Sequence, residues 1–373
     1  MYNTIYKILE SNRVDGLYYT HVSLINPKGK FQIPRQNLEL FWDEYCKLIE
    51  NNTNSDSLRE CKANIGRQSL PPLRDIGLAE KPQHYLPVLV DVDIKIKDND
   101  DIEFGEKIYN ETHISQVISI YQSVFRKIIS DLQEEHLYCF VLEKPMYRVN
   151  NYIKNGFHLH FPFTFLSKTH QEVHLLPRVK ALVQQGKVFE NIGFKNSGDL
   201  IDESYCRVNW LLYGSKKDEN MEPYLLSKII NGEGDEISLS EALQDYTLYD
   251  IDENPMDFKG REEFFLPRIL SVVPFCRKSL QLKSNLSSPL KEIAKKKNKE
   301  KEVERKKYQT ESVQEEVKKA REILNFVSPS RADDYNDWMN IGWTLYNISD
   351  GTEEGLNLWI DFSSKSEEKF DES

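Results

Sequence analysis

Hydrophobic and polar residues alternate along residues 86–97 with almost no interruption. Val88, Val90, Val92, Ile94 and Ile96 fall on one side, and Asp91, Asp93, Lys95 and Lys97 on the other. Alternation with a period of two, in β-branched residues, predicts a half-buried β-strand. We expect the apolar side to face a core, so that the other side presents two carboxylates followed by two ammonium groups.

A second alternating segment follows at residues 156–163. Phe157, Leu159 and Phe161 fall on one side, and Gly156, His158 and His160 on the other. Residues 137–143 and 208–213 are further apolar segments of strand length. The pattern therefore predicts several strands in the middle of the chain.

Helical spacing of apolar residues appears at 36–50, 114–132 and 169–190. The order of strand, helix, strand and strand after residue 86 predicts an α+β fold with helices on one face of an antiparallel sheet. Residues 1–80 contain no chemical motif and are expected to form an accessory layer on a core at 81–285.

The composition changes after residue 285. Residues 291–307 hold nine Lys or Arg and four Glu with few apolar groups, which predicts a charged helical linker at 286–311. A capping-box pattern begins at Ser312, and apolar residues at helical spacing follow it. We expect a small all-α module at 312–373, at the end of a piece of a longer protein.

Composition narrows the class of protein. The chain has 373 residues, enough for two or three domains, and a formal net charge of -11, which argues mildly against a wholly basic nucleic-acid binder. Five scattered cysteines without Cys-x-x-Cys spacing indicate a reducing, intracellular compartment. No signal peptide or segment long enough to span a membrane is recognisable.

The polar side of the first strand can carry chemistry. Asp91 and Asp93 lie two residues apart, roughly 7 Å along one face, so their carboxylates can converge on one or two divalent ions. Hard oxygen ligands suit Mg²⁺ or Mn²⁺. The alternative is a strand whose polar face is simply solvated.

Two later stretches could hold phosphates. Lys154 precedes His158 and His160 on one side of the second strand, beside Gly156, which would let a ligand approach the backbone. The alternative is that these histidines are only structural.

An acid of the stretch from Asp199 to Glu203, at the edge of a strand, could complete a metal site. The turn at Ser215, Lys216 and Lys217 offers N–H groups and two cations to a polyphosphate, although it also fits an ordinary surface turn.

Three acids, a lysine–histidine strand and a basic turn together fit nucleotidyl transfer, in which two metal ions clamp the attacking hydroxyl and the leaving pyrophosphate. The same groups would serve a metal-dependent nuclease. The number of phosphate-holding cations favours synthesis.

The order of Asp-x-Asp, Gly-x-His before an apolar run, and a later apolar-Asp resembles the archaeo-eukaryotic primase superfamily. Within it, the stretches 86–93, 156–162 and 211–217 are similar to the primase–helicase of nucleocytoplasmic large DNA viruses. Residues 328–342 resemble the helical domain that follows the primase core. The resemblance implies an RRM-like antiparallel sheet with flanking helices, and a superfamily 3 helicase downstream.

The resemblance also implies roles. Asp91, Asp93 and Asp202 would hold Mg²⁺ or Mn²⁺, with Asp199 as the fallback for Asp202, and His158 would contact the incoming nucleoside triphosphate. Lys154, Gly156, Ser215, Lys216 and Lys217 would bind the nucleotide, with His160 ranked second and Arg148 assisting from its loop. Gly156 stands where many relatives have Ser, so one hydroxyl contact is expected to be missing.

The sequence therefore predicts a nucleotidyltransferase: a DNA primase, or primase-polymerase, that copies a single-stranded DNA template at a viral replication site in the host cytoplasm or nucleus. The alternatives are a non-catalytic module that binds DNA and loads a helicase, and a metal-dependent nuclease. Lys95 and Lys97 are expected to offset the nearby carboxylates or to meet DNA phosphates. Structural zinc at His170 and His174 is not expected, because no cysteine lies nearby in sequence.

Overall fold

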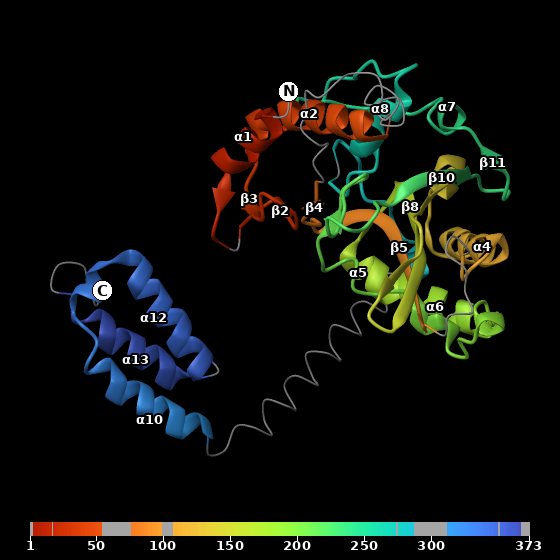
Figure 1. Ribbon diagram of the computed structural model, residues 1–373. Helices are drawn as coiled ribbons and strands as arrows, with labels where there is room; N and C mark the ends of the chain where they lie inside the picture. Colours follow the sequence, from red (N-terminus) through yellow and green to blue (C-terminus); the bar gives the residue numbers. More distant parts are fainter. Residues whose placement is uncertain are drawn as a thin grey trace. The chain divides into compact units, whose positions relative to one another are not determined.

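The computed structural model describes residues 3–16, 18–53, 76–98, 107–273, 275–286, 312–349 and 351–366. The chain forms two compact units, Met1–Ser287 and Ser288–Ser373 (Figure 1). The charged linker predicted at 286–311 lies outside the described residues, except for Leu286.

A six-stranded antiparallel sheet, called the large sheet below, is the centre of the first unit. Its strand order is β11-β10-β6-β8-β5, and β7 pairs with β8 beside this path. The strands are β5 (Tyr85–Lys97), β6 (Cys139–Glu143), β7 (Tyr147–Val149), β8 (Tyr152–Ser167), β10 (Leu225–Ile230) and β11 (Glu236–Ile237). The two longest, β5 and β8, are the two alternating segments of the sequence, and they pair directly.

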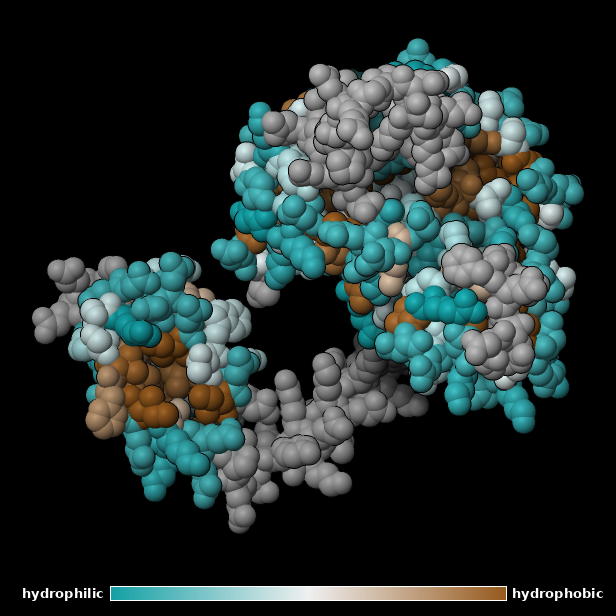
Figure 2. All heavy atoms as spheres, viewed as in Figure 1, coloured by the Kyte–Doolittle hydropathy of each residue, from teal (hydrophilic) through white to brown (hydrophobic). Residues whose placement is uncertain are grey.

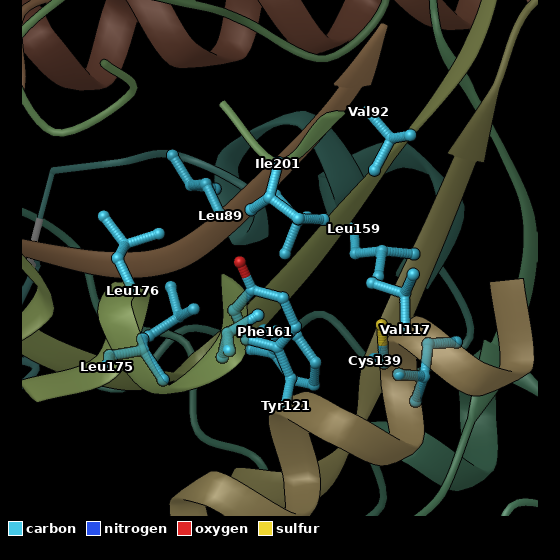
Figure 3. Close-up of a cluster of buried hydrophobic side chains, with 14 of the residues drawn as sticks. Leu89, Val92, Val117, Tyr121, Cys139, Leu159, Phe161, Leu175, Leu176 and Ile201 are labelled. Atoms are coloured by element: carbon cyan, nitrogen blue, oxygen red, sulfur yellow. The ribbon is translucent and has the colours of Figure 1, made fainter. Parts of the chain in front are cut away.

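The apolar side of β5 and β8 faces the main hydrophobic core. Val92, Leu159 and Phe161 are fully buried there against helix α4 (Glu111–Ile128), which contributes Val117 and Tyr121 (Figure 3). Helix α6 (Leu176–Gln185) packs against α4. The expected α+β core with an antiparallel sheet and flanking helices is confirmed.

The opposite face of the large sheet is also partly covered. Phe140 and Leu142 of β6 pack with Leu266 and Leu270, which lie in and just after helix α8 (Glu262–Ile269). The expectation of helices on one face only was therefore wrong. The α8 segment showed no long apolar period, because Pro267 stands inside an eight-residue helix.

A second antiparallel sheet, the small sheet, has the order β1-β3-β2-β4-β9. Its strands are only two or three residues long: β1 (Arg13–Val14), β2 (His21–Ser23), β3 (Gly29–Phe31), β4 (Leu78–Glu80) and β9 (Trp210–Leu211). Helices α1 (Asn3–Ser11) and α2 (Arg35–Thr53) pack on it around Phe41, Trp42 and Tyr45.

Strand β9 joins the two parts of the first unit that the sequence suggested were separate layers. It pairs with β4, so a strand from beyond residue 200 completes a sheet that begins at residue 13. The strand expected at 208–213 is reduced to two residues. The boundary expected near residue 80 therefore falls next to a strand of the small sheet.

Short helical turns connect the remaining elements: η1 (Glu134–Leu137), α5 (Lys168–His170), the π-helical turn η2 (Gln171–Leu175), η3 (Glu190–Ile192), η4 (Ser197–Leu200), α7 (Leu239–Ala242) and η5 (Ser284–Leu286). The helix expected at 169–190 is thus α5, η2 and α6, and it ends at Gln185. Helix α4 ends before Leu132, because Ile129 turns to an extended conformation and bridges Leu282.

The second unit contains α10 (Ser312–Leu324), α11 (Ser330–Asp333), α12 (Tyr335–Ile348) and α13 (Glu353–Ser363). Leu324, Leu345, Leu358 and Phe362 form its core. Figure 2 shows hydrophobic residues gathered at its surface. Phe326, Trp343, Tyr346 and Leu356 are exposed in this unit. Among the described helices of the whole chain, none combines the length and apolar character needed to cross a bilayer.

Candidate active site

A cavity of about 480 Å³ is lined by both sheets of the first unit. The small sheet and its flanking residues contribute a mostly apolar wall: Val22, Leu24, Ala79, Trp210 and Leu211. The facing wall, called the charged wall, includes Asp91, Asp93, Lys154 and His158 from β5 and β8 of the large sheet, and Lys144, Asp202 and Lys217 from the loops after β6, η4 and β9. Six of these seven charged or titratable residues were candidates from the sequence, and Lys144 was not.

The register of β5 and β8 pairs the first two acids with the second motif. Asp91 lies opposite His158, with 3.4 Å between Asp91 Oδ1 and His158 Nε2. Asp93 lies one row further out, and its Oδ2 is 2.8 Å from Lys154 Nζ. Each carboxylate of the Asp-x-Asp pair therefore faces a basic group of the neighbouring strand.

Asp202 is attached to the same strand through its backbone. Its N–H donates to the carbonyl of Asp91 at 3.1 Å, and Ile201 forms a bridge with Val92. Its carboxylate accepts hydrogen bonds from the N–H and hydroxyl of Ser204, at 2.8 and 2.7 Å. A residue more than a hundred positions away is in this way fixed beside Asp91.

Two aromatic residues hold the His158 ring. Tyr224, just before β10, stacks on it with 3.5 Å between ring centroids and an angle of 22°. Trp210 of β9 approaches from the small sheet at 4.8 Å. His158 is 8% exposed, so its imidazole is confined between these rings and Asp91. Neither aromatic residue was a candidate from the sequence.

Lys144 is a further cation that sequence reasoning missed. It directly follows β6, and its Nζ lies 4.3 Å from the Tyr224 ring centroid and 4.7 Å from that of Tyr147. Burial lowers the pKa of Lys144, although Asp93 and Asp91 partly oppose this effect. Lys144 follows a strand predicted from the sequence, and a cation at a strand end could have been considered as a site residue. Only the order of the strands in the sheet shows that this strand end lies near Asp91.

Electrostatics keep the first acid ionised. Burial would raise the pKa of Asp91, but the nearby His158, Lys144 and Lys217 outweigh it and hold that pKa below its ordinary value. The hydrogen bond to Asp93 raises the pKa of Lys154, so this ammonium group stays charged. The charged wall therefore carries both signs at neutral pH.

Some predicted nucleotide contacts are not on the cavity surface. His160 is 1% exposed, and burial lowers its pKa to about 3, so it is neutral and cannot offer a charge to a phosphate. Arg148 pairs with Asp98 at 2.8 Å and does not line the cavity. The expectation that these two side chains reach the nucleotide is not supported by their positions.

The basic turn is also divided. Lys217 lines the cavity, whereas Lys216 does not, and the Lys216 N–H donates to Ile76. Ser215 reaches the cavity surface, but its hydroxyl is bonded to Tyr45 and accepts from the N–H of Leu78, both at 2.9 Å. Ser215 therefore joins the turn to α2 and β4. The fallback acid at residue 199 lies in η4, away from the cavity lining.

The strand pairing gives a second reason, besides the expected approach of a ligand, for a glycine at position 156. A Cβ at this position would lie 2.1 Å from the carbonyl oxygen of Val92. The absence of a side chain lets β5 approach β8 closely in the row where Gly156 lies opposite Asp93. A serine here would need the strand backbone to move.

The carboxylates of Asp91, Asp93 and Asp202 are the chemical type that Mg²⁺ and Mn²⁺ prefer, and all three line one cavity. Their present partners are His158, Lys154 and Ser204. Within the described residues, no three His, Cys, Asp or Glu side chains stand close enough together to hold a metal ion. The donor set fits a divalent ion in kind, and binding would require these carboxylates to exchange partners.

Comparison with known protein families gives two matches. The family described as the C962R protein N-terminal AEP domain, where AEP stands for archaeo-eukaryotic primase, matches residues 20–230. The family Primase C terminal 2 matches residues 320–373. The first match begins within the small sheet and includes all three acids.

Curated relatives come from large DNA viruses. "Putative helicase 184R" of Invertebrate iridescent virus 6 is 32% identical, over 99% of this chain and 37% of its own length. "Putative helicase 121R" of Invertebrate iridescent virus 3 is 29% identical, over 95% of this chain and 36% of its own. A mimivirus protein, "Putative helicase L207/L206", is 25% identical over 98% of this chain. The chain spans about a third of the length of these relatives.

Proposed function

Because this chain belongs to the archaeo-eukaryotic primase family of large DNA viruses, we propose that it is a DNA primase that joins nucleotides on a single-stranded template. The observation that most supports this assignment is the contact of each strand acid of the charged wall with a basic group of the paired strand. Asp91 lies opposite His158 in the register, and Asp93, which lies opposite Gly156, forms an ion pair with Lys154 of the same paired strand.

The proposed reaction is attack of a 3′-oxygen on the α-phosphorus of a nucleoside triphosphate, with breakage of the bond to pyrophosphate. When bound at Asp91, Asp93 and Asp202, Mg²⁺ or Mn²⁺ would neutralise charge on the attacking and leaving oxygens. Lys144, Lys217 and His158 would bind the phosphate oxygens from the same wall.

The cavity residues also explain how this chain would position the nucleotide. Tyr224 and Trp210 limit rotation of the His158 ring, so its Nε2 is aimed at the acid row before any ligand arrives. Lys154 and His158 now contact the carboxylates of Asp93 and Asp91. When a divalent cation took their place beside these carboxylates, the two basic side chains would be free to bind the phosphates. Preorganised charges of this kind are what phosphoryl transfer needs from a protein.

A further proposed partner is suggested by the part of the relatives that this chain does not cover. The relatives named as putative helicases extend well beyond the part matched here. We propose that a helicase region of this kind, joined downstream, exposes the single strand that the primase copies.

The test is incorporation of labelled nucleotides, ribo- and deoxynucleotides separately, on a single-stranded DNA template with Mn²⁺ or Mg²⁺. The parent chain should make short products, and Asp91→Ala/Asp93→Ala should fold normally and make none. A matched double variant of exposed acids at the β10–β11 turn, Glu233→Ala/Glu236→Ala, should remain active.

Each rival has its own result in the same assay. Synthesis retained by the Asp91→Ala/Asp93→Ala variant overturns the proposal. Degradation of the template without incorporation indicates a nuclease, and DNA binding with neither reaction indicates a non-catalytic loading module.

A further inference from the structure

Three neighbouring strands present one continuous polar face that leads outward from the cavity. The register of β5 with β8 sets its rows: Asp91 with His158, Asp93 with Gly156, Lys95 with Lys154, and Lys97 with Tyr152. Strand β7 adds Tyr147 beside Lys154 and Val149 beside Tyr152. Because side chains two positions apart share a face of a sheet, these rows lie side by side in this order.

The character of the rows changes along this face. The two inner rows carry the acids of the cavity, and the outer rows carry cations and tyrosines. Lys95 Nζ lies 3.9 Å from the Tyr152 ring centroid, and Tyr152 is 42% exposed at the strand end. Lys95 and Lys97 are exposed as well. Tyr147 is half-buried and also lines the cavity, so rings and ammonium groups continue outward directly from the proposed catalytic rows.

We propose that this outer strip, defined as Lys95, Lys97, Tyr147 and Tyr152, binds the single-stranded template as it approaches the cavity. The inference rests on the proposed function, because it assigns a path to that reaction's template. Tyrosine rings stack on unpaired bases of any sequence, and lysines between them neutralise the phosphates. A duplex offers no free base faces, so the strip should prefer a single strand.

The local contacts indicate how the strip changes on binding. Lys95 now covers the Tyr152 ring as a cation–π pair. A base that stacked on this ring would take that position, and Lys95 would turn to a phosphate. Arg148 lies between Tyr147 and Val149 in β7, so it points to the opposite face, where it pairs with Asp98. The basic and aromatic residues of the strip therefore lie on one face of these strands, and Arg148 forms an ion pair on the opposite face.

Fluorescence anisotropy tests the strip without any catalysis. The full 373-residue chain is titrated against a labelled single-stranded oligodeoxythymidine at several salt concentrations, with no nucleotide and no divalent ion. Lys95→Ala/Lys97→Ala should reduce the slope of log affinity against log salt by about 1.4, since each single-strand phosphate contact contributes about 0.7.

Tyr152→Ala should weaken binding about tenfold with little change of slope, because it removes stacking and no charge. Tyr152→Phe keeps the ring and should bind like the parent chain. The control is Lys127→Ala, an exposed lysine of α4 on the far side of the large sheet, which should leave both affinity and slope unchanged.

The outcomes separate this inference from the proposed function. Affinity and slope equal to the parent in both the double-lysine and Tyr152→Ala variants overturn the strip, even if the parent makes primers. Weakened binding by these variants in a parent chain that incorporates no nucleotide supports the strip and overturns the primase assignment. Equal loss in Tyr152→Phe and Tyr152→Ala would also count against stacking.

Discussion

The two walls of the cavity are built in opposite ways. The charged wall stands on β5 and β8, strands of 13 and 16 residues whose register runs unbroken from Val88 to Lys97 and whose far side is mostly apolar. The facing wall comes from strands of two or three residues. Long strands fix several charged groups at known spacing, whereas short strands only close the cavity and must gain stability elsewhere.

The small sheet gains that stability partly from buried polar groups. Glu80 is 1% exposed and accepts hydrogen bonds from the Ser271 hydroxyl and the Val272 N–H, at 2.9 to 3.0 Å. His21 lies opposite Glu80 in the sheet, with 3.7 Å between Nε2 and the carboxylate. We infer that variants of the charged wall should change chemistry at constant stability, and variants of the small sheet should do the reverse.

The largest expected difference between an effect on activity and an effect on stability is at Lys144. Lys144→Ala removes a preorganised cation from the charged wall and should lower kcat/KM for incorporation by about 10²- to 10³-fold. Urea unfolding should be nearly unchanged. The control is Lys107→Ala. Lys107 pairs with Glu143, the last residue of β6, and does not line the cavity. Equal loss of activity in both variants would remove the special role of Lys144.

The small sheet should respond to pH instead. Burial raises the pKa of Glu80 to about 7 and lowers the pKa of His21 to about 3. Because the folded state holds the Glu80 proton more tightly, this group stabilises the fold at low pH, and its contribution is lost as the pH rises from 4.5 to about 7. His21 acts in the opposite sense, destabilising the fold as the pH falls below 6.5.

Glu80→Gln cannot ionise and should remove the Glu80 part of the pH dependence. Relative to the parent, its free energy of unfolding should rise by on the order of 3 kcal/mol between pH 4.5 and 8, because burial raises the pKa of Glu80 from 4.5 to about 7. Urea unfolding across this pH range measures the difference, and primer synthesis per folded molecule should be retained. If the free energy of unfolding changed with pH in the same way in variant and parent, the raised pKa of Glu80 would be contradicted.

Gly156 tests whether the charged wall is wholly free of stability effects. Gly156→Ala places a Cβ against the Val92 carbonyl and should cost about 1–3 kcal/mol of unfolding free energy through overpacking. Gly16→Ala is the matched control, since its Cβ would meet only one atom, at 3.9 Å. If Gly156→Ala is as stable as the control but inactive, the position serves the ligand rather than the strand pair.

The sequence predicted the large sheet far better than the small one, for a physical reason. Alternation over a dozen residues distinguishes a strand from a helix, and β5, β8 and α4 were long enough to show their periods. Strands such as β1 and β9 have two residues each, too few to show any period. Their pairing depends on tertiary contacts, so residues 1–80 looked like an accessory layer.

The candidate site divides in the same way. Asp91, Asp93 and His158 could be assigned to one place because each lies on the polar side of a long alternating strand. Lys144 and Tyr224 carry no local pattern, and they reach the cavity only through the pairing of β10 with β6. The misplacement of His160 has a related cause, since alternation predicts the face of a residue and not what covers it.

The register of β5 and β8 contains one irregularity, where Pro87 pairs with Phe165 and Val88 with Phe161. Between this point and Lys97, inserting or deleting one residue in β5 would turn the Asp91 and Asp93 side chains toward the core. At the irregular point itself, β8 already has three unmatched residues, so a change of length there alters the bulge and leaves the pairing of Asp91 with His158 in place. During evolution, length variation in this strand pair should therefore collect at the bulge and be purged from the stretch between it and Lys97.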